Sequence, residues 1–355
     1  MSTRVPAARH AAAPPRGSDA GVRTSDLTGA TGALGGDAAG KPPRHRPMSS
    51  TSPVHRPLSA LDRAAVWLNS EPLTADALRG RVVLIDFWTY SCVNWLRTLP
   101  YVMAWHERYT GDGLVVVGAH APEFGFEHDL DNVRRAAREL GVGHAVVIDN
   151  DFAIWRSFEN HYWPAVYLVD RDGRVRFHHF GEGAYEETER AVQQVLGVDR
   201  EIARVDAAGL AEAADRDTLR SPETYVGRAR AERRSDRDAD GLALNHWGLA
   251  GDWAVSAEAA VLEAAPGSIA YRFQARDLNL VLAPPASGAP VRFAVRLDGQ
   301  PPEDAHGVDV DASGEGAVSE PRMYQLVRQR GPVSERLFEL TFLDAGVRAY
   351  VFTFG

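Results

Sequence analysis

Residues 82–100 read VVLIDFWTYSCVNWLRTLP, and this stretch decides the fold. Its first part, Val82–Phe87, is an apolar run with the length and β-branched content of a buried strand. Cys92, the only cysteine among the 355 residues, follows shortly after this strand. A helical pattern then begins, since apolar residues recur at helix spacing at Trp95, Leu96, Leu99, Val102, Met103 and Trp105.

The position of Cys92 predicts a reactive thiol. A residue on the turn from a strand into a helix faces backbone N–H groups that have no partner within the helix. The positive end of the helix dipole favours the thiolate there, and we expect solvent to reach the sulfur. The alternative for a lone cysteine is a small buried side chain that serves only packing.

The stretch resembles the active site of the thioredoxin superfamily. The likeness rests on Asp86-Phe87-Trp88, on Cys92, on Pro100 inside the helix and on Trp163-Pro164 before a later strand. Thioredoxins carry Cys-x-x-Cys at the start of the helix, whereas this sequence reads Cys92-Val93-Asn94-Trp95. The resemblance implies that Pro164 follows a cis peptide bond and faces Cys92.

A closer likeness is to the soluble C-terminal part of DipZ-type cytochrome c biogenesis proteins. It covers nearly everything from about residue 60 to the C-terminus. The similar segments are WTYSC, RTLPYV, APEF, YWP and HHFGEG, at Trp88–Cys92, Arg97–Val102, Ala121–Phe124, Tyr162–Pro164 and His178–Gly183. The resemblance implies an α/β thioredoxin-like domain of the TlpA type and a last domain similar to a carbohydrate-binding jelly roll.

The first two parts of the chain differ in composition and in period. Residues 1–57 are rich in Ala, Pro, Gly, Ser and Arg, and they are predicted to be a disordered tail. Met48 within this tail is an alternative start. Residues 58–198 alternate strand and helix patterns and finish in a hairpin with an Asp172-Gly173 turn. This order predicts the thioredoxin-like α/β domain.

The second half changes to a period of two. Residues 199–220 are rich in Ala, Asp and Arg and are predicted to be a helical linker. In residues 221–355, apolar and polar side chains alternate, as in Ile269–Gln274 and Arg292–Leu297, and the latter run ends at an Asp298-Gly299 turn. Short alternating strands with turn signals predict an all-β sandwich domain.

Composition excludes several classes of function. The hydrophobic fraction of 45% is typical of a globular protein, and the length leaves room for two domains. Residues 1–57 hold 8 Lys and Arg against 3 Asp and Glu, so the remainder holds 31 against 45. An acidic folded part argues against a nucleic-acid partner. We find no apolar run long enough to span a membrane and no secretory signal, so we expect a cytoplasmic location.

Neither a metal nor a cofactor is predicted. A single cysteine allows no internal disulfide and no cysteine-based zinc cluster. Residues 309–320 have the acidic spacing of an EF-hand calcium loop, but Val308 and Val310 alternate as in a strand. A polar hairpin turn is therefore the better interpretation of this segment.

Asp86 and Trp95 complete the set of residues that we expect to decide the chemistry. Asp86 lies in an otherwise apolar strand, where burial raises the pKa of a carboxyl group. The matching Asp of thioredoxins shuttles protons to the second cysteine, but Trp95 occupies that cysteine's position. Asp86 is thus either a proton shuttle or a satisfied polar group of the core. Because tryptophan cannot attack a mixed disulfide, monothiol chemistry at Cys92 is left, with attack of the thiol on a peroxide to give a sulfenate as the alternative.

Three further residues are candidates for substrate binding: Trp88, Trp163 and Glu123. Backbone groups at Trp163 could pair with a bound peptide, and Glu123 lies on a loop after a strand, where a solvated acid is the alternative. The partners expected for Cys92 are a client protein or a low-molecular-weight disulfide. In the sandwich domain, Trp247 and Trp253 could stack on a glycan, although buried tryptophans are equally ordinary there.

Two functional hypotheses follow, and Trp95 divides them. In the first, the chain is a thioredoxin-like oxidoreductase with Cys92 as its sole nucleophile. In the second, the thioredoxin-like domain has lost turnover and acts with the sandwich as a binding or scaffolding protein.

Overall fold

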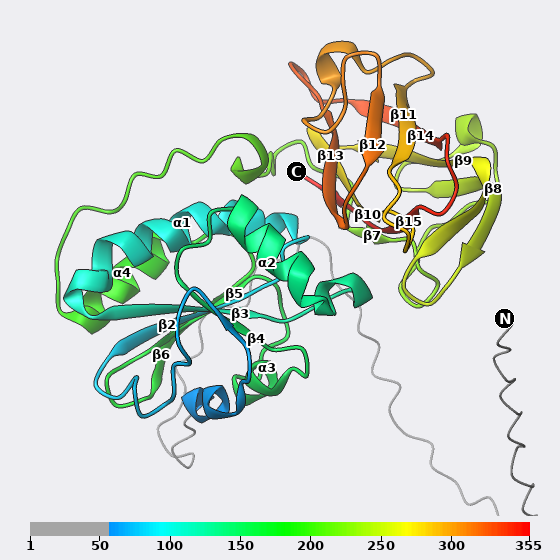
Figure 1. Cartoon of the computed structure of the whole chain (residues 1–355). Coiled ribbons are helices and arrows are strands. Elements are labelled where there is room, and N and C mark those ends of the chain that lie inside the picture. The colour runs from blue at the N-terminus through cyan, green and yellow to red at the C-terminus, as the bar shows by residue number, and fades with distance from the viewer. Residues whose placement is uncertain (1–56) are drawn as a thin grey trace, which may run out of the picture. The chain divides into compact units, whose positions relative to one another are not determined.

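The strand predicted at the head of the Cys92 stretch lies in the middle of a six-stranded sheet. The computed structural model describes residues 57–355 (Figure 1). The predicted tail up to residue 56 and the alternative start at Met48 lie outside the described residues. The strand order of the sheet is β1-β4-β3-β2-β5-β6, with bounds Trp67–Leu68, Ala145–Ile148, Leu114–His120, Val82–Trp88, Ala165–Val169 and Val175–Phe180.

The pairing directions of this sheet bring three loops to one edge. Strands β2, β3 and β4 are parallel, while β5 is antiparallel to β2. The ends of parallel strands meet at the same edge, so the segments that follow β2 and β3 are neighbours there. Strand β5 runs the other way and therefore begins at that same edge. The predicted strand Val82–Phe87 is confirmed to within one residue.

Helices cover both faces of the sheet. Within residues 57–355, the α-helices are α1 (Val93–Tyr109), α2 (Leu130–Glu139), α3 (Ala153–Ser157) and α4 (Tyr185–Leu196). Helices α1 and α4 share one buried cluster with alternate side chains of β2, while α3 and the 3-10 helix η1 (Pro57–Arg63) share another. Alternation of Val82–Phe87 between the two covered faces explains why this strand is apolar apart from Asp86.

The linker prediction was wrong in its secondary structure. Residues 199–220 contain no α-helix, only a short 3-10 turn, η4, at Gly209–Ala211. Tertiary contacts hold this segment extended: the backbone N–H of Ala203 donates to Glu189, and Glu212 pairs with Arg276 and Arg328. Helix propensity is a weak preference that such contacts override.

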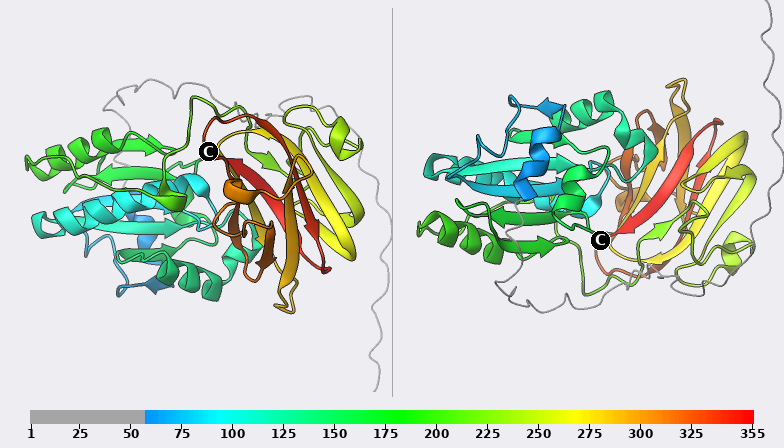
Figure 2. Two further views of the ribbon diagram at one scale, coloured as in Figure 1. Left: turned by 90° about the horizontal axis from the view of Figure 1, so that it is seen from above. Right: turned by 90° about the horizontal axis from the view of Figure 1, so that it is seen from below.

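The C-terminal domain is a β-sandwich, as predicted. Its antiparallel strands form one connected set, ordered β12-β11-β14-β9-β15-β10-β13, with β7 beside β15 and β8 beside β9. Their bounds are Glu315–Val318, Val291–Leu297, Glu335–Phe342, Ala260–Gln274, Arg348–Phe354, Asp277–Ala283, Arg322–Arg328, Thr224–Tyr225 and Trp247–Val255. Figure 2 shows these strands folded over one another in two further views.

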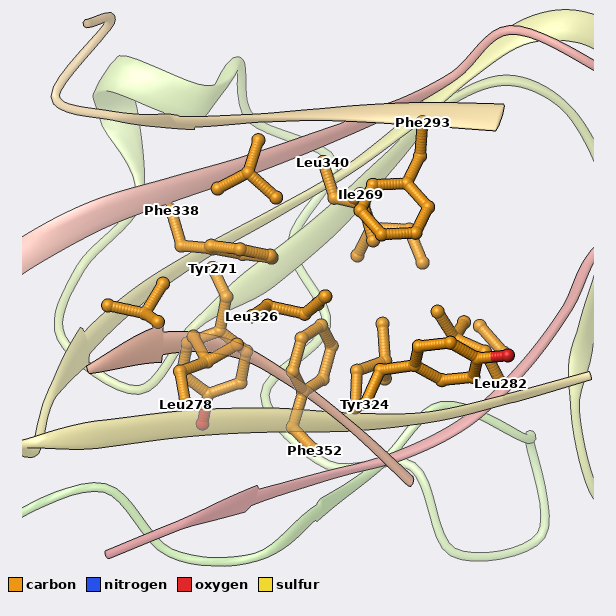
Figure 3. Packing of buried hydrophobic residues seen from close by; sticks show 14 of the residues in the cluster. Ile269, Tyr271, Leu278, Leu282, Phe293, Tyr324, Leu326, Phe338, Leu340 and Phe352 are labelled. Atoms are coloured by element: carbon orange, nitrogen blue, oxygen red, sulfur yellow. The ribbon is translucent and has the colours of Figure 1, made fainter. Parts of the chain in front are cut away.

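The alternating side chains of the sandwich meet in its interior. Ile269, Tyr271, Phe293, Phe338 and Leu340 come from β9, β11 and β14, and they face side chains of β10, β13 and β15 (Figure 3). The predicted turn at Asp298-Gly299 has positive φ at both residues, +51° and +76°, which is the geometry of a type I′ hairpin turn.

The described residues belong to one compact unit, and the two domains share a buried cluster. Phe124 of the α/β domain packs on Tyr350 of the sandwich with ring centroids 5.1 Å apart. Arg135 of α2 forms an ion pair with Glu320 at 2.9 Å. None of the helices within residues 57–355 has the length and apolar run that a membrane crossing requires.

Candidate functional site

Three loops meet at the sheet edge where β2 and β3 end and β5 begins. The backbone N–H of Ala121 donates to the carbonyl of Trp88 at 3.0 Å, which joins the first two loops. The indole Nε1 of Trp163 donates to the carbonyl of Ala121, also at 3.0 Å, which joins the third. The Trp163–Pro164 peptide bond is cis, and Pro164 is buried. Cys92, which follows β2, belongs to this edge.

Cys92 is the N-cap of α1, in line with the sequence prediction. Its backbone is extended (φ −79°, ψ 114°), its carbonyl accepts from Leu96 at 3.0 Å, and its side chain makes no capping bond. The backbone N–H groups of Trp95 and Asn94 favour the thiolate, which is the helix-end effect expected from the sequence.

The expected low pKa of Cys92 is nevertheless wrong. Burial, the dominant cause, raises the pKa of the thiol well above its ordinary value, and the negative charges of Glu123 and Glu223 raise it further. The residue is half-buried rather than open, and it packs against the buried cluster that both domains share. Desolvation therefore outweighs the helix end, and the thiol is protonated at neutral pH.

Asp86 and Trp95 are hydrogen-bonded to each other. The indole Nε1 of Trp95 donates to Oδ2 of Asp86 at 2.9 Å, and both side chains are fully buried. Burial raises the pKa of Asp86 to about 7, while the hydrogen bond from Trp95 lowers it. Within residues 57–355, Oδ1 of Asp86 has no protein partner. A carboxyl group that stays protonated near neutrality is consistent with such a site.

Trp88 does not line an open surface, which corrects its predicted role in substrate binding. Its ring stacks on the ring of Trp95 with centroids 4.3 Å apart, and neither side chain is exposed. The volume at the position of a second cysteine is thus filled by an aromatic pair. The sequence does not predict this stack, because helix spacing alone does not specify which side chain of the sheet Trp95 meets.

Trp163 and its neighbour provide the more accessible side of the edge. Trp163 is half-buried and packs on Trp155 with ring centroids 4.3 Å apart. Tyr162, just before it, is 54% exposed, an unusual exposure for a large aromatic side chain in this protein. The structure therefore brings Trp163 and Pro164 to the same edge as Cys92, while leaving Tyr162 available to solvent.

Glu123 is tied to the C-terminal domain rather than solvated. Its Oε1 accepts from the hydroxyl of Tyr225 at 2.7 Å and from Nη1 of Arg230 at 2.9 Å. The hydroxyl of Tyr225 also lies 3.1 Å from Oε2 of Glu223. Arg230 stacks over the Tyr225 ring, 3.6 Å from its centroid. We call Glu123, Glu223, Tyr225 and Arg230 the mouth cluster.

The loop that carries Glu123 is held by a buried acid that the sequence analysis missed. Glu127 accepts from the backbone N–H of Glu123 at 2.6 Å and from that of Phe124 at 3.0 Å, and Ser91 donates to its other oxygen. Burial raises the pKa of Glu127 to about 7, and these hydrogen bonds from Ser91 and Phe124 lower it. Ser91 thereby links the loop of Glu123 to the residue before Cys92.

Sequence reasoning also missed Glu223, Tyr225 and Arg230. Tyr225 is 102 residues from Glu123 in the chain, and no motif joins them. The one available signal was the Ala-Pro-Glu-Phe segment, which placed Glu123 near the site without naming its partners.

Comparisons with known proteins agree with this architecture. Residues 221–355 match the family described as "Thioredoxin like C-terminal domain". The protein DipZ of Mycobacterium tuberculosis is 34% identical over 252 residues, which are 66% of this chain and 35% of DipZ. The thiol-disulfide oxidoreductase YkuV of Bacillus subtilis is 29% identical over 143 residues, 40% of this chain and 96% of YkuV.

Among solved structures, a thioredoxin-like protein in its oxidised form is 31% identical, with a TM-score of 0.37. That match covers 41% of this chain and 99% of the other. The chain spans about a third of the length of the DipZ relatives that it matches.

Proposed function

We propose that this chain, which is homologous to DipZ and to thiol-disulfide oxidoreductases of the thioredoxin family, carries out monothiol disulfide exchange through Cys92. The single observation that carries the proposal is that Trp95, hydrogen-bonded to Asp86, occupies the position of the resolving cysteine three residues after Cys92. The Cys92 thiolate attacks one sulfur of a disulfide and forms a mixed disulfide, and the other sulfur leaves as a thiolate that takes up a proton.

An external thiol must then release the product. The Trp95 indole donates to Asp86 and stacks on Trp88, so no group of the helix can attack the mixed disulfide. The raised pKa of Cys92 makes the forward step slow at neutral pH, because only the thiolate is nucleophilic. The protein is thus a slow enzyme that accumulates as its mixed disulfide. Its partner is a client protein or a small disulfide.

A second function is favoured by the same burial. The cover over Cys92 supports a non-catalytic binding or scaffolding protein in which the thioredoxin-like domain docks a partner. Of the two tryptophans considered for a glycan, Trp247 is fully buried, whereas Trp253 is half-buried. An accessible aromatic face is what sugar stacking requires.

Trapping of adducts separates the two functions. The native protein and a Cys92→Ser variant would be exposed to an oxidised small thiol at pH 8.5 and weighed by intact mass spectrometry. Monothiol exchange predicts one adduct on the wild type and none on the variant. If the unfolded wild type reacts and the native protein does not, the scaffolding function takes its place.

A further inference from the structure

Residues of the sandwich domain reach the loop of Glu123, which belongs to the same sheet edge as Cys92. Tyr225 and Glu223 lie at the short strand β7 (Thr224–Tyr225) and just before it, and Arg230 lies in the loop that follows. Both Tyr225 and Arg230 bind Glu123, which stands on the loop joined to the end of β2. Tyr225 and Cys92 pack against the same buried cluster. Glu127 joins the loop of Glu123 to Ser91, the residue before Cys92, and the charges of Glu123 and Glu223 act on the thiol.

The charges of the mouth cluster do not cancel. Arg230 forms an ion pair with Glu123 at 2.9 Å, so these two charges offset each other. Glu223 has only the Tyr225 hydroxyl within hydrogen-bond distance and forms no ion pair with any residue of the described range 57–355. Tyr225 has a single hydroxyl proton, so it cannot donate to both carboxylates at once. One unpaired carboxylate is left beside the thiol.

We propose that the mouth cluster selects the substrate of Cys92 by charge, so that disulfides bearing positive groups react faster than disulfides bearing negative groups. This inference rests on the proposed monothiol function. The residue that sets the preference is Glu223, a specificity determinant from the sandwich domain, while Arg230 limits the preference by neutralising Glu123. A charged group that approaches the attacking sulfur meets the field of these side chains before the new S–S bond forms.

The electrostatic environment of the thiol supports the sign of this preference. Glu123 and Glu223 both raise the pKa of Cys92 through their negative charge, so their field reaches the sulfur. Desolvation and the charge of Glu123 raise the pKa of Glu223 to about 7, while Tyr225 and Arg230 lower it. At pH 8, which lies above this value, the carboxyl of Glu223 is mostly ionised.

Disulfide exchange at Cys92 needs no added oxidant or reductant. The Cys92 thiolate forms a bond to one sulfur of the disulfide, the original S–S bond breaks, and the second half leaves as a thiolate that is protonated by water. The charged groups of the substrate take no part in the bonds. These charged groups change only the local concentration of the disulfide at the mouth cluster and the energy of its approach to Cys92.

Three symmetric disulfides of similar length test the proposal at pH 8: cystamine, which is cationic, hydroxyethyl disulfide, which is neutral, and dithiodipropionate, which is anionic. The rate of Cys92 adduct formation would be measured by intact mass and divided by the rate for the unfolded chain. At low salt we expect the cationic reagent to exceed the anionic one by about fivefold or more. High salt should reduce this ratio towards one.

Three variants assign the effect to its residues. Glu223→Gln removes the unpaired charge and should reduce the cationic-to-anionic ratio by roughly threefold. Arg230→Gln uncovers the charge of Glu123 and should increase the ratio. The matched control is Glu258→Gln, because Glu258 also reaches from the sandwich to the α/β domain, at the N–H of Gly125 (2.6 Å), but is not part of the mouth cluster. Its ratio should equal that of the wild type.

The outcomes separate this inference from the function on which it rests. Adducts that form with equal normalised rates for all three disulfides, or a ratio that Glu223→Gln leaves unchanged, overturn the charge selection and leave monothiol exchange standing. A control variant that changes the ratio as much as Glu223→Gln also overturns it. If none of the disulfides gives an adduct with native Cys92, both the function and the inference are wrong.

Discussion

The indole of Trp95 donates a hydrogen bond of 2.9 Å to the carboxyl group of Asp86, at the position where a dithiol enzyme would have its second thiol. This contact explains how a buried acid is accommodated in an apolar strand that has no second cysteine with which to exchange protons. It also closes the helix side of Cys92, because the indole is fully buried and stacked on Trp88. Asp86 is therefore a residue of the core, and one of its carboxyl oxygens accepts a hydrogen bond.

The pKa of Asp86 predicts the pH dependence of an Asp86→Asn variant. The native carboxyl keeps its proton up to about pH 7, whereas the ordinary value is 3.8. The native state therefore loses stability, relative to the unfolded chain, as the pH rises from about 4 to 7, and the loss is complete above 7. The substitution removes this loss, so we expect it to raise the free energy of unfolding at pH 8 by on the order of 2–4 kcal/mol and to change it little at pH 4.

Urea denaturation of the wild type and the variant at both pH values is the measurement. The histidines that also titrate in this range are common to the two proteins, so their contributions cancel in the difference. Equal stabilisation at pH 4 and pH 8 would show that Asp86 has no raised pKa.

Trp95→Cys should convert the site from one thiol to two. We expect the wild type to show no catalytic reduction of insulin disulfides, and the variant to gain measurable turnover, because Cys-x-x-Cys is restored at a helix start. The loss of a fully buried tryptophan should also lower stability by about 3–5 kcal/mol. Trp95→Ala leaves a similar cavity without a thiol and is the matched control. Turnover in that control, or in the wild type, would refute the role assigned to Trp95.

Native Cys92 should be a slow nucleophile at pH 7. Since burial raises its pKa, we expect iodoacetamide to alkylate the native thiol at least about tenfold more slowly than Cys92 of the unfolded chain, tenfold being the effect of one pKa unit on the thiolate fraction. The rate should rise with pH up to the limit of the folded state. If the native thiol reacts faster than the thiol of the unfolded chain, the pKa of Cys92 is lowered, as its position at the helix start predicted.

The spacing of apolar residues predicted the helices and strands well, because burial of one or both faces of such an element imposes that spacing. The buried strand at Val82–Phe87 was located to within one residue, and the helical pattern from Trp95 to Trp105 lies within α1. Tertiary contacts were not predictable in this way. The segment at 199–220 is extended because Glu189 and two arginines of the sandwich bind it, and nothing in its own composition shows those partners.

The candidate site shows the same division. Cys92 and the Trp163-Pro164 pair were found from local motifs, and the structure brings them to one edge of the sheet. The thiol's raised pKa was missed because its causes are a cover shared by two domains and two carboxylates distant in sequence. Local sequence describes the helix end that favours thiolate, but not the desolvation that opposes it.

Formation and release of an adduct at Cys92 is the most direct test of the central claim, which is that this site forms a mixed disulfide with no internal exit. The wild type, Cys92→Ser and Trp95→Cys would be incubated with an oxidised small thiol at pH 8.5, separated from it, and followed by intact mass before and after addition of the reduced thiol. The account predicts a single adduct on the wild type that persists until the reduced thiol is added, none on Cys92→Ser, and spontaneous loss from Trp95→Cys. An adduct that leaves the wild type without added thiol, or a native Cys92 that never forms one while the unfolded chain does, would contradict it.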